Sequence, residues 1–262
     1  CFMKPRPVWL IARSVLIEAV RRREIYVIVL ACSILIGAVM TVDFFDIQGL
    51  TKFYREVALK LMSIATALTV IVLSARQLPR EFEKRTIYPL LAKPISRGSF
   101  LLGKLLGVML AASFCFGLFM AIYLLGTLYL GGEIPWILFA QYIFLQLLMM
   151  LILATLSFWL SLLLNLDAAI TIGLLLYVFA ASFMSITSMM YDYAGRFGRA
   201  VLVFLTWALP QLPLFDLSGK AVHADIWDPI RFKTMGILFL YALVFSSVYY
   251  FLALIWFRRR SL

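Results

Sequence analysis

The chain has 262 residues, of which 64% are hydrophobic and 14% are charged, with a formal net charge of +11. Soluble domains carry about 25% charged residues, so this composition excludes a water-soluble globule and predicts an integral membrane protein. The positive charges lie between apolar runs, which is typical of the positive-inside bias of membrane proteins and not of a nucleic-acid-binding surface.

The first element predicted along the chain is an amphipathic helix within residues 5–24. At about 100° per residue, its apolar side chains share one face, while Glu18, Arg21 and Arg22 share the opposite face. The apolar face must be shielded from water, and a basic amphipathic helix buries such a face in a membrane surface. We therefore expect an interfacial helix along the cytoplasmic leaflet. The residues of its apolar face are Val8, Ala12, Val15, Leu16 and Ala19.

Six apolar runs along the chain are predicted to be membrane-spanning helices. A hydrocarbon core of about 30 Å requires roughly 20 residues of helix. The apolar centres of these spans lack Asp, Glu, Lys, Arg and His, because Asp43, Lys60 and Asp167 lie at span edges. Their absence disfavours a proton-coupled carrier. The predicted spans are 25–42, 57–75, 100–130, 136–164, 168–190 and 234–257.

Residues 76–104, between the second and third predicted spans, form the most distinctive segment. They are rich in charge and are interrupted by Pro79, Pro89 and Pro94. The spacing leaves room for a short helix around residues 80–88, in which Phe82 stands among charged side chains. Exposed apolar groups ringed by charges are typical of a docking surface, although a basic loop held at lipid headgroups has the same composition.

The third predicted span begins with a stripe of small residues. Gly103, Gly107 and Ala111 are spaced four residues apart and therefore share one helix face. A stripe of this kind lets another helix approach closely. The sequence leaves open whether that helix belongs to the same chain or to a second copy.

Residues 191–233, between the fifth and sixth predicted spans, are expected to form an external loop with short re-entrant or interfacial helices. The apolar run 200–209 ends at Pro210 and is too short to cross a bilayer. A crossing there would also place the basic tail, Arg258 to Arg260, outside. With six spans, one face holds both termini and 16 of the 24 Lys and Arg residues, and the positive-inside rule makes this face cytoplasmic.

Residues that support catalysis or cofactor binding are sparse. His223 is the only histidine, so a multi-histidine metal site is not expected. Residues 98–105 match the glycine and lysine spacing of a phosphate-binding loop, but Leu105 stands where a Ser or Thr would hold magnesium. We expect no catalytic residue, no cofactor and no ATPase machinery in this chain.

Within residues 76–104, several residues follow a characteristic order: an acidic residue, Thr, a leucine pair, Pro, a hydrophobic residue, Ser, Arg and Lys. These residues are Glu83, Thr86, Leu90, Leu91, Pro94, Ile95, Ser96, Arg97 and Lys104. The order resembles the cytoplasmic coupling region of permease subunits of ATP-binding-cassette (ABC) transporters of the type-2 exporter family. Arg85 stands where that family commonly has Gly. Residues 209–216 also resemble an external segment of some members.

The resemblance implies an all-α integral membrane fold, a single permease domain over residues 1–262. It would have six transmembrane helices, an interfacial N-terminal helix, a cytoplasmic coupling helix within 76–104, and short helices within 191–233. It also implies that two permease subunits, the same or related chains, form an export pathway. Two copies of a cytoplasmic ABC ATPase, which binds ATP and Mg, would dock beneath them. A bacterial-type inner membrane and accessory periplasmic or membrane proteins fit the same likeness.

The resemblance assigns roles to residues in the coupling segment. Glu81, Glu83 and Arg85 would make polar contacts with the ATPase, and Leu90 and Leu91 would pack the segment. Charged groups on a cytoplasmic loop are well suited to docking a soluble partner, which would supply the energy source that the apolar spans lack.

Three other functions remain open from the sequence. A gradient-driven carrier or channel would transport without an ATPase, and a non-transporting assembly or anchoring subunit would use the same segment for docking alone. A membrane enzyme would require a cluster of His, Asp or Glu near an interface, which the sequence lacks. The apolar spans favour a lipid-linked, amphiphilic or hydrophobic cargo, but lipid-facing surface explains the same composition.

Overall fold

The computed structural model describes residues 5–21, 23–39, 47–83, 96–191, 193–222 and 228–259, and all regular elements within them are helices. This confirms the predicted all-α class for the described part of the chain. The elements are α1 (Pro5–Val20), α2 (Arg23–Val39), α3 (Ile47–Glu83), α5 (Arg97–Tyr129), α6 (Trp136–Leu163), α7 (Leu166–Tyr191), α8 (Arg196–Ala208), the 3₁₀ helix η1 (Leu212–Phe215), α9 (Ser218–Val222) and α10 (Phe232–Arg259).

Four of the described helices are long and apolar enough to cross a bilayer. These stretches are Thr51–Pro79, Arg97–Tyr129, Trp136–Leu163 and Phe232–Arg259. Two shorter apolar helices, Tyr26–Val39 and Leu166–Ala180, occupy the positions of the first and fifth predicted spans. The chain is therefore a multi-pass membrane protein, and each predicted span corresponds to an apolar helix of the structure.

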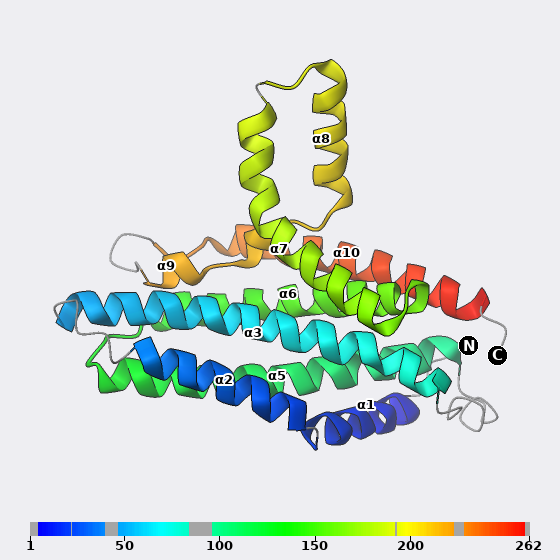
Figure 1. The fold of residues 1–262 in the computed structure, drawn as a ribbon, viewed down its shortest axis with the longest axis horizontal. Helices are drawn as coiled ribbons and strands as arrows, with labels where there is room; N and C mark the ends of the chain where they lie inside the picture. Colours follow the sequence, from blue (N-terminus) through cyan, green and yellow to red (C-terminus); the bar gives the residue numbers. More distant parts are fainter. Residues whose placement is uncertain are drawn as a thin grey trace.

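The long helices form one elongated bundle in which α6 is central (Figure 1). α6 contacts α3, α5, α7 and α10, and it buries Tyr142 and Leu145 completely. Tyr123 of α5 stacks on both Tyr54 of α3 and Phe139 of α6, with ring centroids 6.4 Å and 5.5 Å apart. These contacts join three helices near one end of the bundle.

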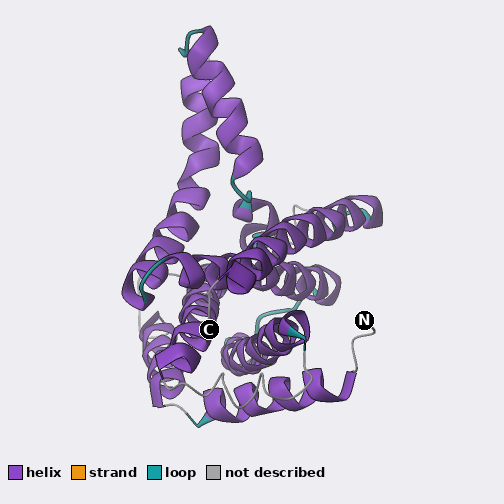
Figure 2. Cartoon of the chain, turned by 90° about the vertical axis from the view of Figure 1, so that its right-hand side faces the viewer, coloured by secondary structure: helices purple, strands orange, loops and turns teal. Residues whose placement is uncertain are grey.

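The last part of α7 and α8 form a hairpin that projects from the side of the bundle, as both views show (Figures 1 and 2). α8 has 13 residues, which is too short for a helix to cross a bilayer. Its exposed face carries large apolar side chains, including Phe197 and Phe204. The short run near residues 200–209 is thus part of a short helix, and its place outside the membrane stays a prediction.

The helix α1 crosses one side of the bundle (Figure 2), and the stripe of small residues on α5 is its contact surface. A Cβ atom on Gly107 would lie 2.5 Å from Cβ of Val15 and 2.8 Å from the carbonyl oxygen of Ala12. The partner of the stripe is therefore a helix of the same chain. The apolar face of α1 is covered by α5 and not by lipid, whereas Trp9 and Leu10 on another face are exposed.

The end of α3 differs from the sequence prediction. Pro79 was expected to interrupt the chain before a separate short helix, but α3 continues through Pro79 to Glu83. Proline lacks an N–H and crowds the preceding turn, which normally ends a helix. Here the last turn is held from outside, because Phe82 packs on Phe257 and Glu81 pairs with Lys104.

Candidate functional site

The ends of α3 and α5 that flank residues 84–95 are joined by an ion pair. The Lys104 ammonium lies 2.5 Å from Oε1 of Glu81, and the two side chains are only 6% and 18% exposed. Nζ of Lys104 also donates to Oε1 of Gln77 at 3.4 Å and lies 5.8 Å from the centroid of the Phe100 ring. The charge of Lys104 is therefore compensated on several sides, as a buried charge requires.

The start of α5 is also tied to the end of α10. Nη1 of Arg97 donates to the carbonyl oxygens of Phe257 and Arg258 at 3.1 Å and 3.0 Å. The last carbonyls of a helix lack partners within the helix and carry partial negative charge, so a guanidinium there is stabilising. The Tyr250 hydroxyl donates to the carbonyl oxygen of Gly98 at 2.9 Å and adds a second tie between the same two helices.

An aromatic cluster fills the space beneath these polar contacts. The fully buried ring of Phe257 lies 6.1 Å from Phe82 and 6.0 Å from Phe100, measured between centroids. The sequence prediction placed Phe82 among exposed docking groups, whereas the structure packs it against α10. We call the joined ends of α3, α5 and α10 the root of the coupling segment, defined by Glu81, Phe82, Arg97, Lys104 and Phe257.

The root contains three of the residues that the sequence singled out for coupling: Glu81, Arg97 and Lys104. Glu83 is the last residue of α3. The remaining predicted coupling residues lie outside the described part of the chain; they are Arg85, Thr86, Leu90, Leu91 and Pro94. The other predicted set, Gly103, Gly107 and Ala111, is buried in α5.

Polar contacts also draw residues 209–222 into the bundle, where the sequence predicted an external loop. Nη2 of Arg55 donates to the carbonyl oxygen of Ala221 at 2.7 Å, and the Lys60 ammonium lies 2.5 Å from Oδ2 of Asp216. The backbone N–H of Gln211 donates to the Tyr241 hydroxyl at 3.0 Å. These contacts tie the segment to α3 and α10, and η1 also packs against α6 and α7.

Lys60 lies near the start of the second predicted span, and the structure pairs it with Asp216. The helical stretch Thr51–Pro79 begins with a polar part that includes Lys52, Arg55 and Glu56, so Lys60 lies close to the polar start of the span. Burial raises the pKa of Asp216, but hydrogen bonds from Lys60 and Ser218 and the charge of Lys60 outweigh burial, so this pKa lies below its ordinary value. Asp216 is thus ionised, and the pair satisfies both charges.

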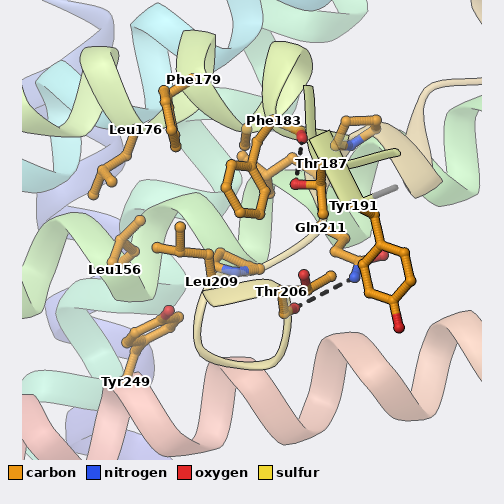
Figure 3. A pocket seen from close by; sticks show the side chains of 14 residues that line it. Leu156, Leu176, Phe179, Phe183, Thr187, Tyr191, Thr206, Leu209, Gln211 and Tyr249 are labelled. Atoms are coloured by element: carbon orange, nitrogen blue, oxygen red, sulfur yellow. Dashed lines mark hydrogen bonds between the residues drawn. The ribbon is translucent and has the colours of Figure 1, made fainter. Parts of the chain in front are cut away.

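Two cavities, each of about 330 Å³, adjoin η1 and share Leu212 and Pro213 in their walls. The first is nearly all apolar and lies between α7, α8 and α10, with Phe179, Phe183 and Tyr249 around it (Figure 3). Its few polar groups bond to protein, because Thr187 donates to Phe183 and Gln211 donates to Thr206, as dashed lines in Figure 3 show. The second lies between α3, α6, α7 and η1 and includes Lys60 and Asp216.

Metal ligation has no support in the described ranges, in which no group of three or more His, Cys, Asp or Glu side chains converges. His223 lies outside those ranges. The polar groups described above join helices to one another, either at the root or around η1.

A protein-family model described as an ABC-2 family transporter protein matches residues 9–262. The chain belongs to the ABC-2 transporter family. It is a membrane subunit, and ABC-2 permeases pair with ABC ATPases and hydrolyse no ATP themselves. No curated protein matches the chain at a significant level.

In an ABC-2 permease, the energy of ATP hydrolysis must reach the membrane helices through contacts with the partner. The root joins the ends of three long helices through Lys104, Arg97 and Phe257. Polar and aromatic contacts thus connect the end of α3, the start of α5 and the end of α10.

Proposed function

We propose that the chain is the transmembrane subunit of an ATP-driven exporter. Two permease subunits, identical or related, form the translocation pathway. Two copies of a cytoplasmic ABC ATPase bind residues 76–104 from the cytoplasmic side. The family match over nearly the whole chain carries this proposal. The geometry of the root supports it, because a segment that couples to a partner needs a firm connection to the helices that move.

The proposed topology has six crossings, with both described ends of the chain in the cytoplasm of a bacterial-type inner membrane. α2, with 17 residues, is at the lower limit for a crossing, and α7 is longer. The root supports this topology independently of the charge rule. The end of α3, the start of α5 and the end of α10 can meet there only when they lie on the same side.

Within the coupling segment, we assign the ATPase contacts to Glu83 and Arg85 and a positioning role to Glu81. Glu81 is engaged with Lys104 inside the root, so its carboxylate orients the end of α3. Thr86, Leu90, Leu91 and Pro94 would shape the segment between α3 and α5. α1 would lie at the cytoplasmic surface with Trp9 and Leu10 toward lipid.

The test reverses the two proposed contact charges in the variant Glu83→Arg/Arg85→Glu. We expect the purified complex to lose at least about tenfold of its ATP-dependent transport, because charge reversal at an interface places like charges together. The chain should still insert in the membrane, since both positions lie beyond the root. Transport into inverted vesicles, the ATPase rate and co-purification of the ATPase measure transport, hydrolysis and assembly of the complex, respectively.

A matched control reverses two exposed charges elsewhere, in Glu133→Arg/Arg196→Glu. This variant should retain coupled transport. Unchanged coupling in the Glu83→Arg/Arg85→Glu variant would contradict the assignment of the segment. Transport by the purified chain in the absence of any ATPase would instead identify a gradient-driven carrier or channel.

A further inference from the structure

Lys60 stands out among the charged residues of the bundle because it lies in the wall of a cavity. It lies one turn after Glu56, close to the polar start of the apolar part of α3. Ionisable groups that face a cavity in a membrane bundle often mark a pathway or a binding site. Its ion-pair partner, Asp216, comes from the segment that returns into the bundle after α8.

The cavity beside Lys60 has walls from four elements. α3 contributes Lys60, Ser63 and Leu68, α7 contributes Leu174 and Tyr177, and α6 and η1 close the remaining sides. At about 330 Å³ it lies near the lower end of the range for small-molecule sites, about 300–1,000 Å³. It can hold a headgroup and the first part of a chain, but not an entire lipid.

The cavity is polar at one end and apolar at the other. A Cβ on Gly173 would lie 3.0 Å from Cγ2 of Ile71, which fixes the register between α3 and α7. With the helices antiparallel, Leu174 lies level with Leu68, whereas Tyr177 lies beside Ser63, one turn from Lys60. Charged and hydroxyl groups therefore gather at the Lys60 end, about two helical turns from the end formed by Leu68 and Leu174.

Hydrogen-bonding capacity at the polar end favours an acceptor-rich ligand. The carboxylate of Asp216 is engaged at both oxygens, since Oδ2 accepts from Lys60 at 2.5 Å and Oδ1 accepts from the N–H of Ser218 at 3.0 Å. An ammonium has three donors, and the side chain of Lys60 is 59% exposed despite its pair with Asp216. The donors that remain suit a phosphate or carboxylate group.

We propose that this cavity binds an anionic amphiphile, with its phosphate or carboxylate headgroup at Lys60 and its hydrocarbon chain toward Leu68 and Leu174. The hydrocarbon chain can leave sideways, because Ile64 and Val178 on the rim of the cavity are exposed on the surface of the bundle. That this amphiphile is the exported cargo rests on the proposed function. Binding itself requires only this chain.

The experiment measures binding of dodecyl phosphate to the purified full chain in neutral maltoside micelles. The rise in melting temperature with dodecyl phosphate concentration yields a dissociation constant. We expect Lys60→Gln to bind at least tenfold more weakly than wild type. Leu68→Trp, which keeps the charge and fills the apolar end, should also bind at least tenfold more weakly. Lys52→Gln removes the same charge two turns earlier on α3, outside the cavity, and should bind as wild type does.

Several outcomes would overturn the proposal. Wild-type affinity in Lys60→Gln would do so, as would equal weakening in Lys52→Gln, which would indicate a general charge effect on the micelle. Inorganic phosphate that binds as tightly as dodecyl phosphate would show a site for a free anion. If Lys60→Gln does not fold, the Lys60→Gln/Asp216→Asn variant removes both charges and keeps similar shapes, and it must show the same loss.

The result of the dodecyl phosphate experiment is independent of the result for the Glu83→Arg/Arg85→Glu variant. Dodecyl phosphate binding is measured without an ATPase, so a failed binding experiment leaves ATPase co-purification and coupled transport unaffected. A chain that binds dodecyl phosphate but recruits no ATPase would keep the amphiphile site and remove only its interpretation as an export site.

Discussion

At the scale of residues, the main positions are charged side chains that join helices. Lys104 and Glu81 connect α5 to α3, Arg97 caps α10, and Lys60 holds Asp216. Each charge has a specific partner inside a bundle that is otherwise mostly apolar. Because burying an unpaired charge is strongly unfavourable, these pairs constrain which helix ends can lie together.

The pair of Lys104 and Glu81 supports a stability prediction. Lys104→Met removes the ammonium that pairs with the carboxylate of Glu81, which is 18% exposed. Breaking a buried pair in this way costs about 3–5 kcal/mol, and we expect a clearly lower melting temperature in detergent. Thermal unfolding of the purified chain, followed by circular dichroism, measures the loss.

The corresponding control is the double variant Glu81→Gln/Lys104→Met. It removes both charges, so most of the stability lost in Lys104→Met should return, since a buried pair is often replaceable by neutral groups. If the double variant is as unstable as the sum of the two single changes, the two charges do not stabilise each other and the account of the root is wrong.

At the scale of elements, the sequence predicted the helices well and their contacts poorly. Runs of about 20 apolar residues identify spans whatever their neighbours are, which is why all six positions carry an apolar helix. The end of α3 was missed, because what holds it beyond Pro79 is tertiary contact with Phe257 and Lys104. The same limitation hid the role of Lys60, whose partner Asp216 is far away in sequence.

The contact between α1 and α5 yields a prediction about glycine. Gly107→Ala would place a Cβ 2.5 Å from Cβ of Val15 and 2.8 Å from a backbone oxygen, so α1 must move away. We expect a lower melting temperature and faster proteolysis within α1. Gly117→Ala is the matched control on the same helix, because a Cβ there meets nothing within 4 Å.

The two alanine variants should shift stability in opposite directions. Alanine is favoured over glycine in a helix by about 1 kcal/mol, so Gly117→Ala should be neutral or slightly stabilising. A Gly107→Ala variant with the stability of Gly117→Ala would show that α1 does not pack closely on the stripe in the membrane.

At the scale of the whole molecule, the root and the segment around η1 divide the bundle into two functional regions. The root joins the ends of α3, α5 and α10 next to the proposed ATPase-binding segment. The region around η1 contains the two cavities and the charged pair of Lys60 and Asp216. The proposed export function requires that movement at the first region change the second, and α3 runs between them, from Lys60 to Glu81.

This arrangement requires the six-crossing topology, which single cysteines can test. In a variant that lacks Cys1, Cys32 and Cys115, we introduce Glu18→Cys in α1, Arg259→Cys at the end of α10, or Glu133→Cys between α5 and α6. All three positions are exposed. A membrane-impermeant maleimide added to intact cells should label only Glu133→Cys, whereas inverted vesicles should label Glu18→Cys and Arg259→Cys. Labelling of Arg259→Cys and Glu133→Cys from the same side would mean that α10 does not cross as proposed, and α10 could then not present Phe257 to the root on the cytoplasmic side.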